Sequence, residues 1–176
     1  MPNELFFRRL GPHEAQDYRR LRLECLKEFP ENFMTVYEEQ VLLPKLFMEL
    51  EIEKESNSNF IIGAFSGQQL IGQVAINCEE NPRMKHVAHV LQMYVKPKYS
   101  GQKIGLNMLN FAIVSAWKVE GLEQLRLEVV TTSFSAIKVY VQAGFKEIGL
   151  YKQQMKIGDR YKDAMAMVRF KTEMAS

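Results

Sequence analysis

Three consecutive apolar segments in the middle of the chain constrain its fold most strongly. Residues Asn59–Phe65 and Leu70–Cys78 are separated only by Ser66-Gly67-Gln68-Gln69, a short polar link typical of a β-hairpin. After a polar turn over residues 79–85, a third segment, His86–Val95, alternates imperfectly between apolar and polar residues, which predicts a strand with a β-bulge. We therefore expect an antiparallel sheet at the centre of the fold.

Patterns typical of helices and further strands lie on both sides of these segments. Each is marked by the periodicity of its apolar residues and, in several cases, by Pro or Gly at its end. Before the three strands we expect a strand over residues 4–9, a helix over His13–Phe29 and a second helix over Glu38–Lys54 with a break at Pro44. After them we expect a helix over Lys103–Val119, a strand over Gln124–Val130, a helix from Ser133 as N-cap to Ala143, and strands over Phe145–Lys156 and Tyr161–Phe170. This order predicts one α+β domain over residues 1–176, with a mixed, mostly antiparallel sheet flanked by helices on both faces.

The composition fits an ordinary globular domain and argues against several functional classes. Of the 176 residues, 47% are hydrophobic and 25% are charged, with a formal net charge of +2. Because acidic and basic residues are mixed along the chain, we expect neither nucleic acid nor a membrane as a partner. No apolar run has signal-peptide or membrane-spanning length, so we expect a cytoplasmic protein. Cys25 and Cys78 lack the spacing of metal ligands, and no metal site is expected.

The link between the strand ending at Val95 and the next helix is a candidate phosphate-binding element. Its sequence, Lys98-Tyr-Ser-Gly-Gln-Lys-Ile-Gly105, places two glycines four residues apart, which lets the backbone approach a ligand closely. The first turn of a helix has unpaired N–H groups, so the main chain of residues 101–106 can bind a pyrophosphate, with Lys103 as an added cation. An ordinary strand-to-helix connection is the alternative, and the segment matches neither GxGxxG nor GxxxxGK[ST].

Residues 95–109, VKPKYSGQKIGLNML, resemble motif A of the GNAT N-acetyltransferase superfamily. In that motif a strand and a proline precede [Q/R]xxGx[G/A] at the start of a helix. Gly105 matches the last position of the motif. Ser100 stands where Gln or Arg is usual, and Lys103 stands where the first glycine is usual.

Residues 125–149, LRLEVVTTSFSAIKVYVQAGFKEIG, resemble motif B of the same superfamily. The matching residues are Ala136, Tyr140, Gly144 and Phe145, whereas Ser133 replaces the usual Asn. Residues 163–167 also resemble the last strand of the superfamily, and residues 21–40 resemble the two-helix acceptor region of one of its branches. The resemblance therefore covers nearly the whole chain.

The resemblance implies an N-acetyltransferase that moves an acetyl group from acetyl-CoA directly to a primary amine of a small molecule or peptide. A catalytically silent module that binds acetyl-CoA or CoA, or senses it, is the alternative with the same fold. The implied cofactor-binding residues are Met93, Tyr94, Val95, Ser100, Gly101, Gln102, Lys103, Ile104, Gly105, Leu106, Ser133 and Ala136.

The chemistry of acetyl transfer requires a neutral amine, a polarised thioester carbonyl and a proton for the departing thiolate. The resemblance places the carbonyl beside backbone N–H groups of the bulged strand at residues 93–95. Tyr140 is the predicted general acid, because a phenol is protonated at neutral pH. A core aromatic on a helix is the alternative interpretation of Tyr140.

The general base and the acceptor side are the least defined parts of the site. Two residues are candidate catalytic bases, namely Glu79, just past the strand Leu70–Cys78, and His89, within the strand His86–Val95. Glu79 and Glu80 equally fit a solvated turn, and His89 equally fits a structural histidine. The acceptor side is expected to be lined by Phe33, Thr35 and Tyr37. The free edge of the terminal hairpin makes a homodimer possible.

Overall fold

The computed structural model describes residues 4–174 and contains one seven-stranded sheet in the order β1-β2-β3-β4-β5-β7-β6. Neighbouring strands are antiparallel except β4 and β5, which are parallel. The strands are β1 (Leu5–Arg9), β2 (Asn59–Ser66), β3 (Gln69–Cys78), β4 (Val87–Val95), β5 (Gln124–Val130), β6 (Lys146–Ile157) and β7 (Arg160–Phe170). The predicted fold class is confirmed. Residues 1–3 and 175–176 of the predicted domain lie outside the described residues.

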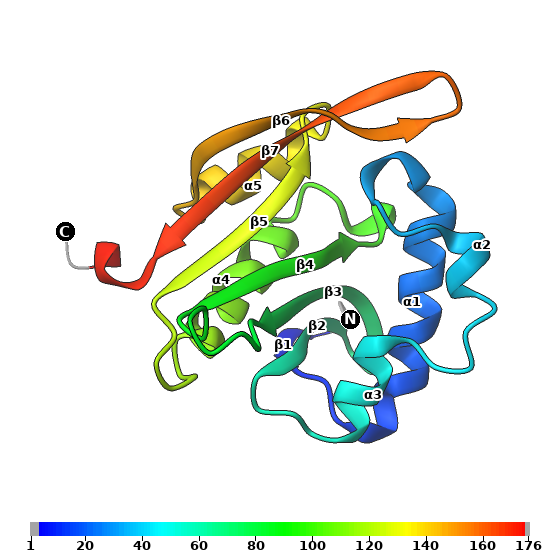
Figure 1. The fold of residues 1–176 in the computed structure, drawn as a ribbon. Coiled ribbons are helices and arrows are strands. Elements are labelled where there is room, and N and C mark those ends of the chain that lie inside the picture. Colours follow the sequence, from blue (N-terminus) through cyan, green and yellow to red (C-terminus); the bar gives the residue numbers. More distant parts are fainter. Residues whose placement is uncertain (1–3, 175–176) are drawn as a thin grey trace.

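Helices cover both faces of the sheet (Figure 1). They are α1 (Ala15–Glu28), α2 (Tyr37–Gln40), α3 (Phe47–Glu53), α4 (Ile104–Ala116) and α5 (Phe134–Gln142), with short 3-10 helices at Pro12–Glu14, Pro30–Asn32, Pro97–Tyr99 and Lys171–Met174. One core lies between the sheet and α4 and α5, and includes Val74, Val90 and Met108. A second core on the opposite face packs α1 and α3 on β2 and β3, and includes Tyr18, Ile52 and Ala75. Burial of these apolar side chains at about 25 cal/mol per Å² drives the packing of both layers.

The break predicted at Pro44 within the second helix, Glu38–Lys54, is confirmed. The chain forms α2 and α3 with a non-helical segment over residues 41–46 between them. Pro44 explains the break, since it has no N–H group and its ring disfavours a helical conformation of the preceding residue.

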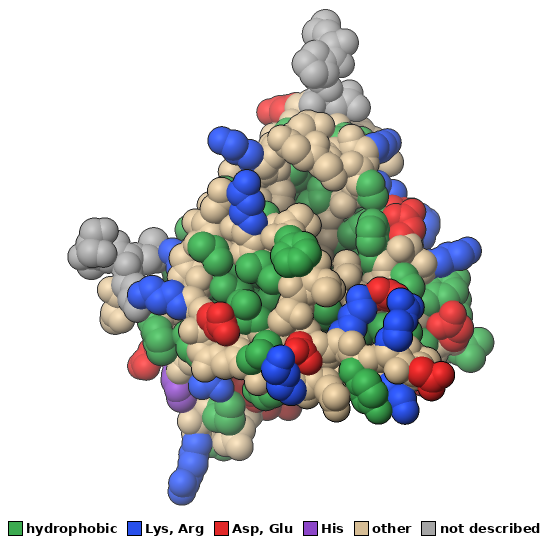
Figure 2. Space-filling model, turned by 90° about the horizontal axis from the view of Figure 1, so that it is seen from above, with side chains coloured by type: hydrophobic (Ala, Val, Ile, Leu, Met, Phe, Trp, Pro, Cys, Tyr) green, Lys and Arg blue, Asp and Glu red, His purple; other side chains and the backbone are tan. Residues whose placement is uncertain are grey.

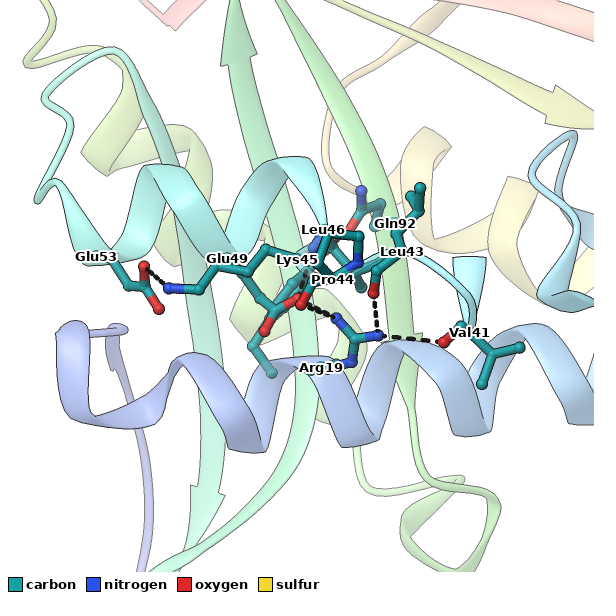
Figure 3. Close-up of polar contacts among 10 residues, drawn as sticks. Arg19, Val41, Leu43, Pro44, Lys45, Leu46, Glu49, Glu53 and Gln92 are labelled. Atoms are coloured by element: carbon teal, nitrogen blue, oxygen red, sulfur yellow. Dashed lines mark hydrogen bonds and ion pairs between the residues drawn. The ribbon is translucent and has the colours of Figure 1, made fainter. Parts of the chain in front are cut away.

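Arg19 of α1 holds the segment between α2 and α3 in place (Figure 3). Its guanidinium donates to the carbonyl oxygen of Leu43 at 2.7 Å and to Oε2 of Glu49 at 2.7 Å. The same Glu49 oxygen accepts the N–H of Leu46 at 2.6 Å, which caps the start of α3. Glu49 is fully buried, so its charge depends on Arg19 for compensation.

Replacing Arg19 with Met is expected to lower the free energy of unfolding by about 2 kcal/mol, because the carboxylate of Glu49 would stay buried without its cation. Arg20→Met on the same helix is the control, since the Arg20–Asp17 ion pair is exposed and is expected to contribute less than about 0.5 kcal/mol. Urea denaturation measures both. Equal effects of the two substitutions would contradict this assignment.

The edge strand β6 and helix α5 carry exposed apolar side chains, including Ile148, Leu150 and Tyr151 of the strand. Figure 2 looks down on the molecule from above the view of Figure 1, and hydrophobic side chains there are interspersed with acidic and basic ones. An unpaired strand edge permits pairing with a second copy. The homodimer stays a prediction.

The strands β4 and β5 form a fork in the middle of the sheet (Figure 1). Their pairing covers only Val87–His89 with Gln124–Arg126, and beyond it the strands are not paired. The predicted bulge in β4 is confirmed, because the register with β3 shifts between Leu91 and Tyr94, and Gln92 has a φ of 55°. The hydroxyl of Tyr18 donates to Oε1 of Gln92 at 2.8 Å and so ties the bulge to α1. The fork leaves backbone groups of β4 free of the neighbouring strand.

Candidate functional site

A cavity of about 580 Å³ lies at the fork between β4 and β5. Two of its walls are residues 89–93 of β4 and residues 127–130 of β5. The remaining lining comes from residues 32–35, residues 132–136 and Tyr140 of α5, Gln154, Met155 and Ala164 of the β6–β7 hairpin, and Arg22 of α1. The cavity thus collects side chains from both faces of the sheet.

Seven residues proposed from the sequence line this one cavity. They are Phe33, Thr35, His89, Met93, Ser133, Ala136 and Tyr140. They come from the loop after α1, from the bulged strand and from α5, and are up to about one hundred residues apart in the chain. The structure therefore brings together the candidate acid, one candidate base and two acceptor-side residues.

Other proposed residues lie outside the cavity lining. Among residues 4–174, Tyr94, Val95 and the segment 100–106 do not contribute to it. The side chain of Tyr94 turns to α1, where its hydroxyl donates to Glu24 at 3.1 Å and Glu28 at 2.9 Å. Burial and these carboxylates raise the pKa of Tyr94 well above its ordinary value. Only backbone atoms of Tyr94 remain for the predicted cofactor contact.

Tyr37 lies outside the cavity lining, whereas Phe33 and Thr35 are part of it. Tyr37 begins α2, and its ring faces Lys27 of α1, with the ammonium nitrogen 5.9 Å from the ring centroid. Its predicted place on the acceptor side stays a prediction.

The start of α4 presents main-chain donors beside β4. Gly101 has a φ of 80°, which glycine adopts readily, and a Cβ on Gly105 would lie 3.2 Å from Cε of Met93. Gly105 therefore permits the close approach of α4 to the bulged strand. Lys103 is the N-cap residue in a left-handed conformation, with a φ of 58°, and its side chain makes no capping hydrogen bond. The first regular bond of the helix joins the N–H of Asn107 to Lys103, so the N–H groups of residues 104–106 precede the ladder.

Tyr140 presents a protonated phenol to the cavity. Its side chain is buried and packs edge-on against Phe145, with ring centroids 6.1 Å apart. Its hydroxyl makes no hydrogen bond to another residue within the described part of the chain. Burial raises the pKa of Tyr140 to about 12, so the group keeps its proton at neutral pH.

His89 and Glu79, proposed as alternative bases, form one pair. Nε2 of His89 lies 2.8 Å from Oε1 of Glu79. His89 lines the cavity, whereas Glu79 stands behind it at the end of β3. When Nε2–H donates to the carboxylate, the lone pair of the neutral imidazole lies on Nδ1. The carboxylate thereby sets the tautomer of a histidine that can accept a proton.

The sequence pattern of the Acetyltransferase (GNAT) family matches residues 15–145, which contain the fork, the start of α4 and the cavity-lining part of α5. The chain belongs to this family. A curated relative, the spermidine N(1)-acetyltransferase of Thermoplasma acidophilum, is 31% identical over 103 residues. The alignment covers 58% of this chain and 60% of that enzyme, so the chain matches about three fifths of the relative's length.

Solved structures of acetyltransferases share the fold. An acetyltransferase of the GNAT family from Streptococcus pneumoniae superimposes with a TM-score of 0.83 at 22% identity, over 95% of this chain and 99% of that chain. A putative acetyltransferase from Salmonella typhimurium with its cofactor acetyl-CoA gives 0.79 at 12% identity, over 99% and 98%. A spermidine N-acetyltransferase from Vibrio cholerae in complex with CoA and spermine gives 0.71 at 19% identity, over 98% of both chains. No helix within residues 4–174 is long and apolar enough to cross a membrane.

In this GNAT chain, residues 30–36 between α1 and α2 form a strap beside the cavity. Oε2 of Glu31 accepts from Nζ of Lys162 at 2.6 Å, and Oε1 accepts from Arg160 at 3.1 Å. Both partners lie on β7, so the strap is joined to the β6–β7 hairpin. Met34 of the strap also meets Gln154 of β6, whose Nε2 lies 3.9 Å from Sδ. These contacts hold two walls of the cavity together.

Ser133 forms a further link to the strap. It is the N-cap residue of α5, as predicted, but the predicted capping by its side chain is wrong. Its hydroxyl instead donates to Oδ1 of Asn32 at 3.3 Å. The hydroxyl is thereby directed to Asn32 of the strap, and it accepts no hydrogen bond from the N–H groups at the start of α5.

The contacts of Glu31 with Arg160 and Lys162, called the Glu31 clasp here, are expected to weaken at low pH. Its ion pairs, chiefly the hydrogen bond from Lys162, lower the pKa of Glu31 below the ordinary value of 4.5. The contribution of a carboxylate whose pKa is lowered by folding is fully present above the ordinary value and is lost as the pH falls through the lowered one. Methyl NMR of Met34 is therefore expected to show a transition below pH 4.5 that is missing in Glu31→Gln. The same transition in both proteins would contradict the clasp.

Several cavity residues were not found from the sequence, namely Arg22, Leu91, Gln92, Glu128, Gln154 and Met155. One signal was present for Arg22. It follows Tyr18 by four residues and precedes Cys25 by three, so it lies on the apolar face of the helix, where a charged residue is unusual.

Proposed function

We propose that this chain transfers the acetyl group of acetyl-CoA to a primary amine of a small molecule or peptide. The observation that carries the proposal is the cavity at the fork, which combines the bulged strand β4, the phenol of Tyr140 and His89, the partner of Glu79. These groups match the needs of acetyl transfer, namely a polarised carbonyl, a proton donor and a proton acceptor.

The residues at the start of α4 fit the pyrophosphate of CoA. The N–H groups of residues 104–106 precede the helical ladder, and the side chain of Lys103 makes no capping bond, so these donors remain for an anion. Lys103 adds positive charge at this end of the helix. Two of the structural neighbours described above hold acetyl-CoA or CoA, which supports the same cofactor here. Bound there, acetyl-CoA would supply the acetyl thioester.

In the proposed reaction, His89 takes a proton from the ammonium form of the acceptor, and Glu79 stabilises the imidazolium that results. Backbone N–H groups of the bulged strand around Met93 donate to the thioester oxygen. The hydroxyl of Tyr140 donates its proton to the departing sulfur, and the second proton that the acceptor nitrogen loses on forming the amide restores the hydroxyl. Overall an ammonium and a thioester give an amide, a thiol and one proton, and no group on the protein is acetylated.

The position of the strap favours a small molecule as the acceptor. It is joined to the β6–β7 hairpin through Glu31 and to α5 through Asn32, which leaves a bounded cavity of about 580 Å³. Cavities of this volume are typical of small-molecule sites. The names of the relatives from Thermoplasma acidophilum and Vibrio cholerae specify a polyamine, which supports an amine as the acceptor.

The test combines binding and turnover. Acetyl-CoA is expected to raise the thermal midpoint of the protein, and a panel of amines should contain one that releases free CoA thiol. Stabilisation without thiol release by any amine would favour the silent binding module over the enzyme. No stabilisation by either acetyl-CoA or CoA would overturn both functions.

A further inference from the structure

Arg22 is a buried cation without a carboxylate partner among the described residues. Its side chain lines the cavity, the residue is only 3% exposed, and Nη1 has no hydrogen-bond partner. The ring of Phe33 lies against the guanidinium, with Cζ 4.8 Å from the ring centroid. Within residues 4–174, no ion pair joins Arg22 to an acidic side chain.

Two titratable groups act on Arg22 within residues 4–174, and both are neutral at neutral pH. Cys25 and Tyr18 lie beside it on α1, and burial raises the pKa of Cys25 to about 12 and that of Tyr18 well above its ordinary range. Burial also lowers the pKa of Arg22, but a guanidinium stays charged throughout the neutral range. A buried charge without a counterion is unfavourable, so the arrangement favours an anion from outside the protein.

The cavity carries opposite charge on its far walls. Glu128 of β5 lines it, and its Oε2 accepts from Nε2 of Gln154 at 3.3 Å. His89 of β4 also lines it and is paired with Glu79, which follows β3. The guanidinium on α1 and these groups on the sheet therefore fit the two ends of a molecule that has both an anionic and a cationic group. The pyrophosphate of CoA does not meet this need, because its expected site at the start of α4 lies outside the cavity.

We propose that the acceptor amine belongs to a molecule that also carries a carboxylate, as an amino acid does, and that Arg22 binds this carboxylate. A planar guanidinium pairs with a carboxylate through two parallel hydrogen bonds, which fixes its orientation. The amine then points to His89 and Glu128. The inference rests on the proposed function and makes it more specific, since it separates this chain from enzymes that act on polyamines, which carry only cationic groups.

The experiment compares amino acids with their own carboxamides, which keep the amine and lose the negative charge. Thiol release from acetyl-CoA is measured for the twenty amino acids, their carboxamides and spermidine. For the best amino acid, kcat/KM is expected to exceed that of its carboxamide by about 100-fold, a preference that Arg22→Met abolishes. Arg22→Lys should restore only part of it, because the ammonium lacks the planar pair of donors. Arg20→Met, which removes a 74% exposed guanidinium on the same helix, should retain the full preference.

A second measurement separates this inference from the proposed activity. Calorimetry with CoA-loaded protein measures the binding of the same amino acids and carboxamides, and thermal unfolding shows that each variant is folded. If no amine releases thiol, the proposed acetyl transfer is contradicted. Binding that depends on the carboxylate and that Arg22→Met removes would still support the inference. Equal binding or turnover of acid and carboxamide, a preference for spermidine, a preference that survives Arg22→Met, or no binding of any amino acid would overturn it.

Discussion

Replacing Tyr140 with Phe is expected to lower kcat by about 100-fold or more, while the affinity for acetyl-CoA stays unchanged. The phenol contacts Phe145 through its ring, and the substitution keeps that ring contact and removes only the hydroxyl. Because burial raises the pKa of Tyr140 to about 12, the hydroxyl is protonated below that pH and can donate to sulfur throughout the neutral range. Steady-state kinetics and calorimetry with acetyl-CoA measure the two quantities separately.

The matched control is Tyr151→Phe, which removes the hydroxyl of an exposed tyrosine on β6 outside the cavity. It is expected to leave kcat within about two-fold, as for most exposed surface positions. Wild-type kcat in Tyr140→Phe would show that Tyr140 serves only as a core aromatic. A loss of cofactor affinity with unchanged kcat would assign the hydroxyl to binding.

The second large effect is expected at His89. Replacing it with Ala should lower kcat by about 100-fold, because no other imidazole lines the cavity in the described part of the chain. Added imidazole is expected to restore part of the rate, since the substitution opens space where the ring stood. Glu79→Gln should cost about 10-fold, because it weakens the orientation of His89 while leaving the imidazole in place.

His13→Ala is the control for this series, since the side chain of His13, in the 3-10 helix Pro12–Glu14, is 78% exposed and does not line the cavity. This variant is expected to retain full activity. Rescue by imidazole would show that the lost group transferred a proton. A His89→Ala protein with wild-type kcat would rule out His89 as the base and leave Glu128, the acidic residue among the described residues that line the cavity. A large loss without any rescue would assign His89 to structure.

The central sheet could be predicted from the sequence because its signals are local. Ser66 to Gln69 form a short polar link between apolar strands, and the hairpin β2–β3 follows from residues adjacent in the chain. The bulge at Gln92 was visible as an interruption of the alternating pattern in β4. Gly105 was likewise found from its position, and the structure adds the reason, which is its close approach to Met93.

The parts of the site that depend on long-range contacts could not be predicted. The bond of Ser133 to Asn32 spans 101 residues, and that of Glu31 to Lys162 spans 131 residues, so no local pattern reports either. Glu79 and His89 were proposed separately, whereas the register of β3 with β4 makes them one pair. The role proposed for Arg22 depends on the neighbours of its guanidinium, which the sequence does not reveal.

The proposed direct transfer is tested most directly by following the acetyl carbon itself. The protein is incubated with acetyl-CoA labelled with ¹³C at the carbonyl and with the best acceptor, and the reaction is observed by ¹³C NMR and by mass spectrometry of the protein. The account predicts that the thioester signal converts into one amide signal on the acceptor, while the mass of the protein stays constant. A label that stays in the thioester, appears as free acetate, or adds to the protein mass would contradict direct acetyl transfer to an amine.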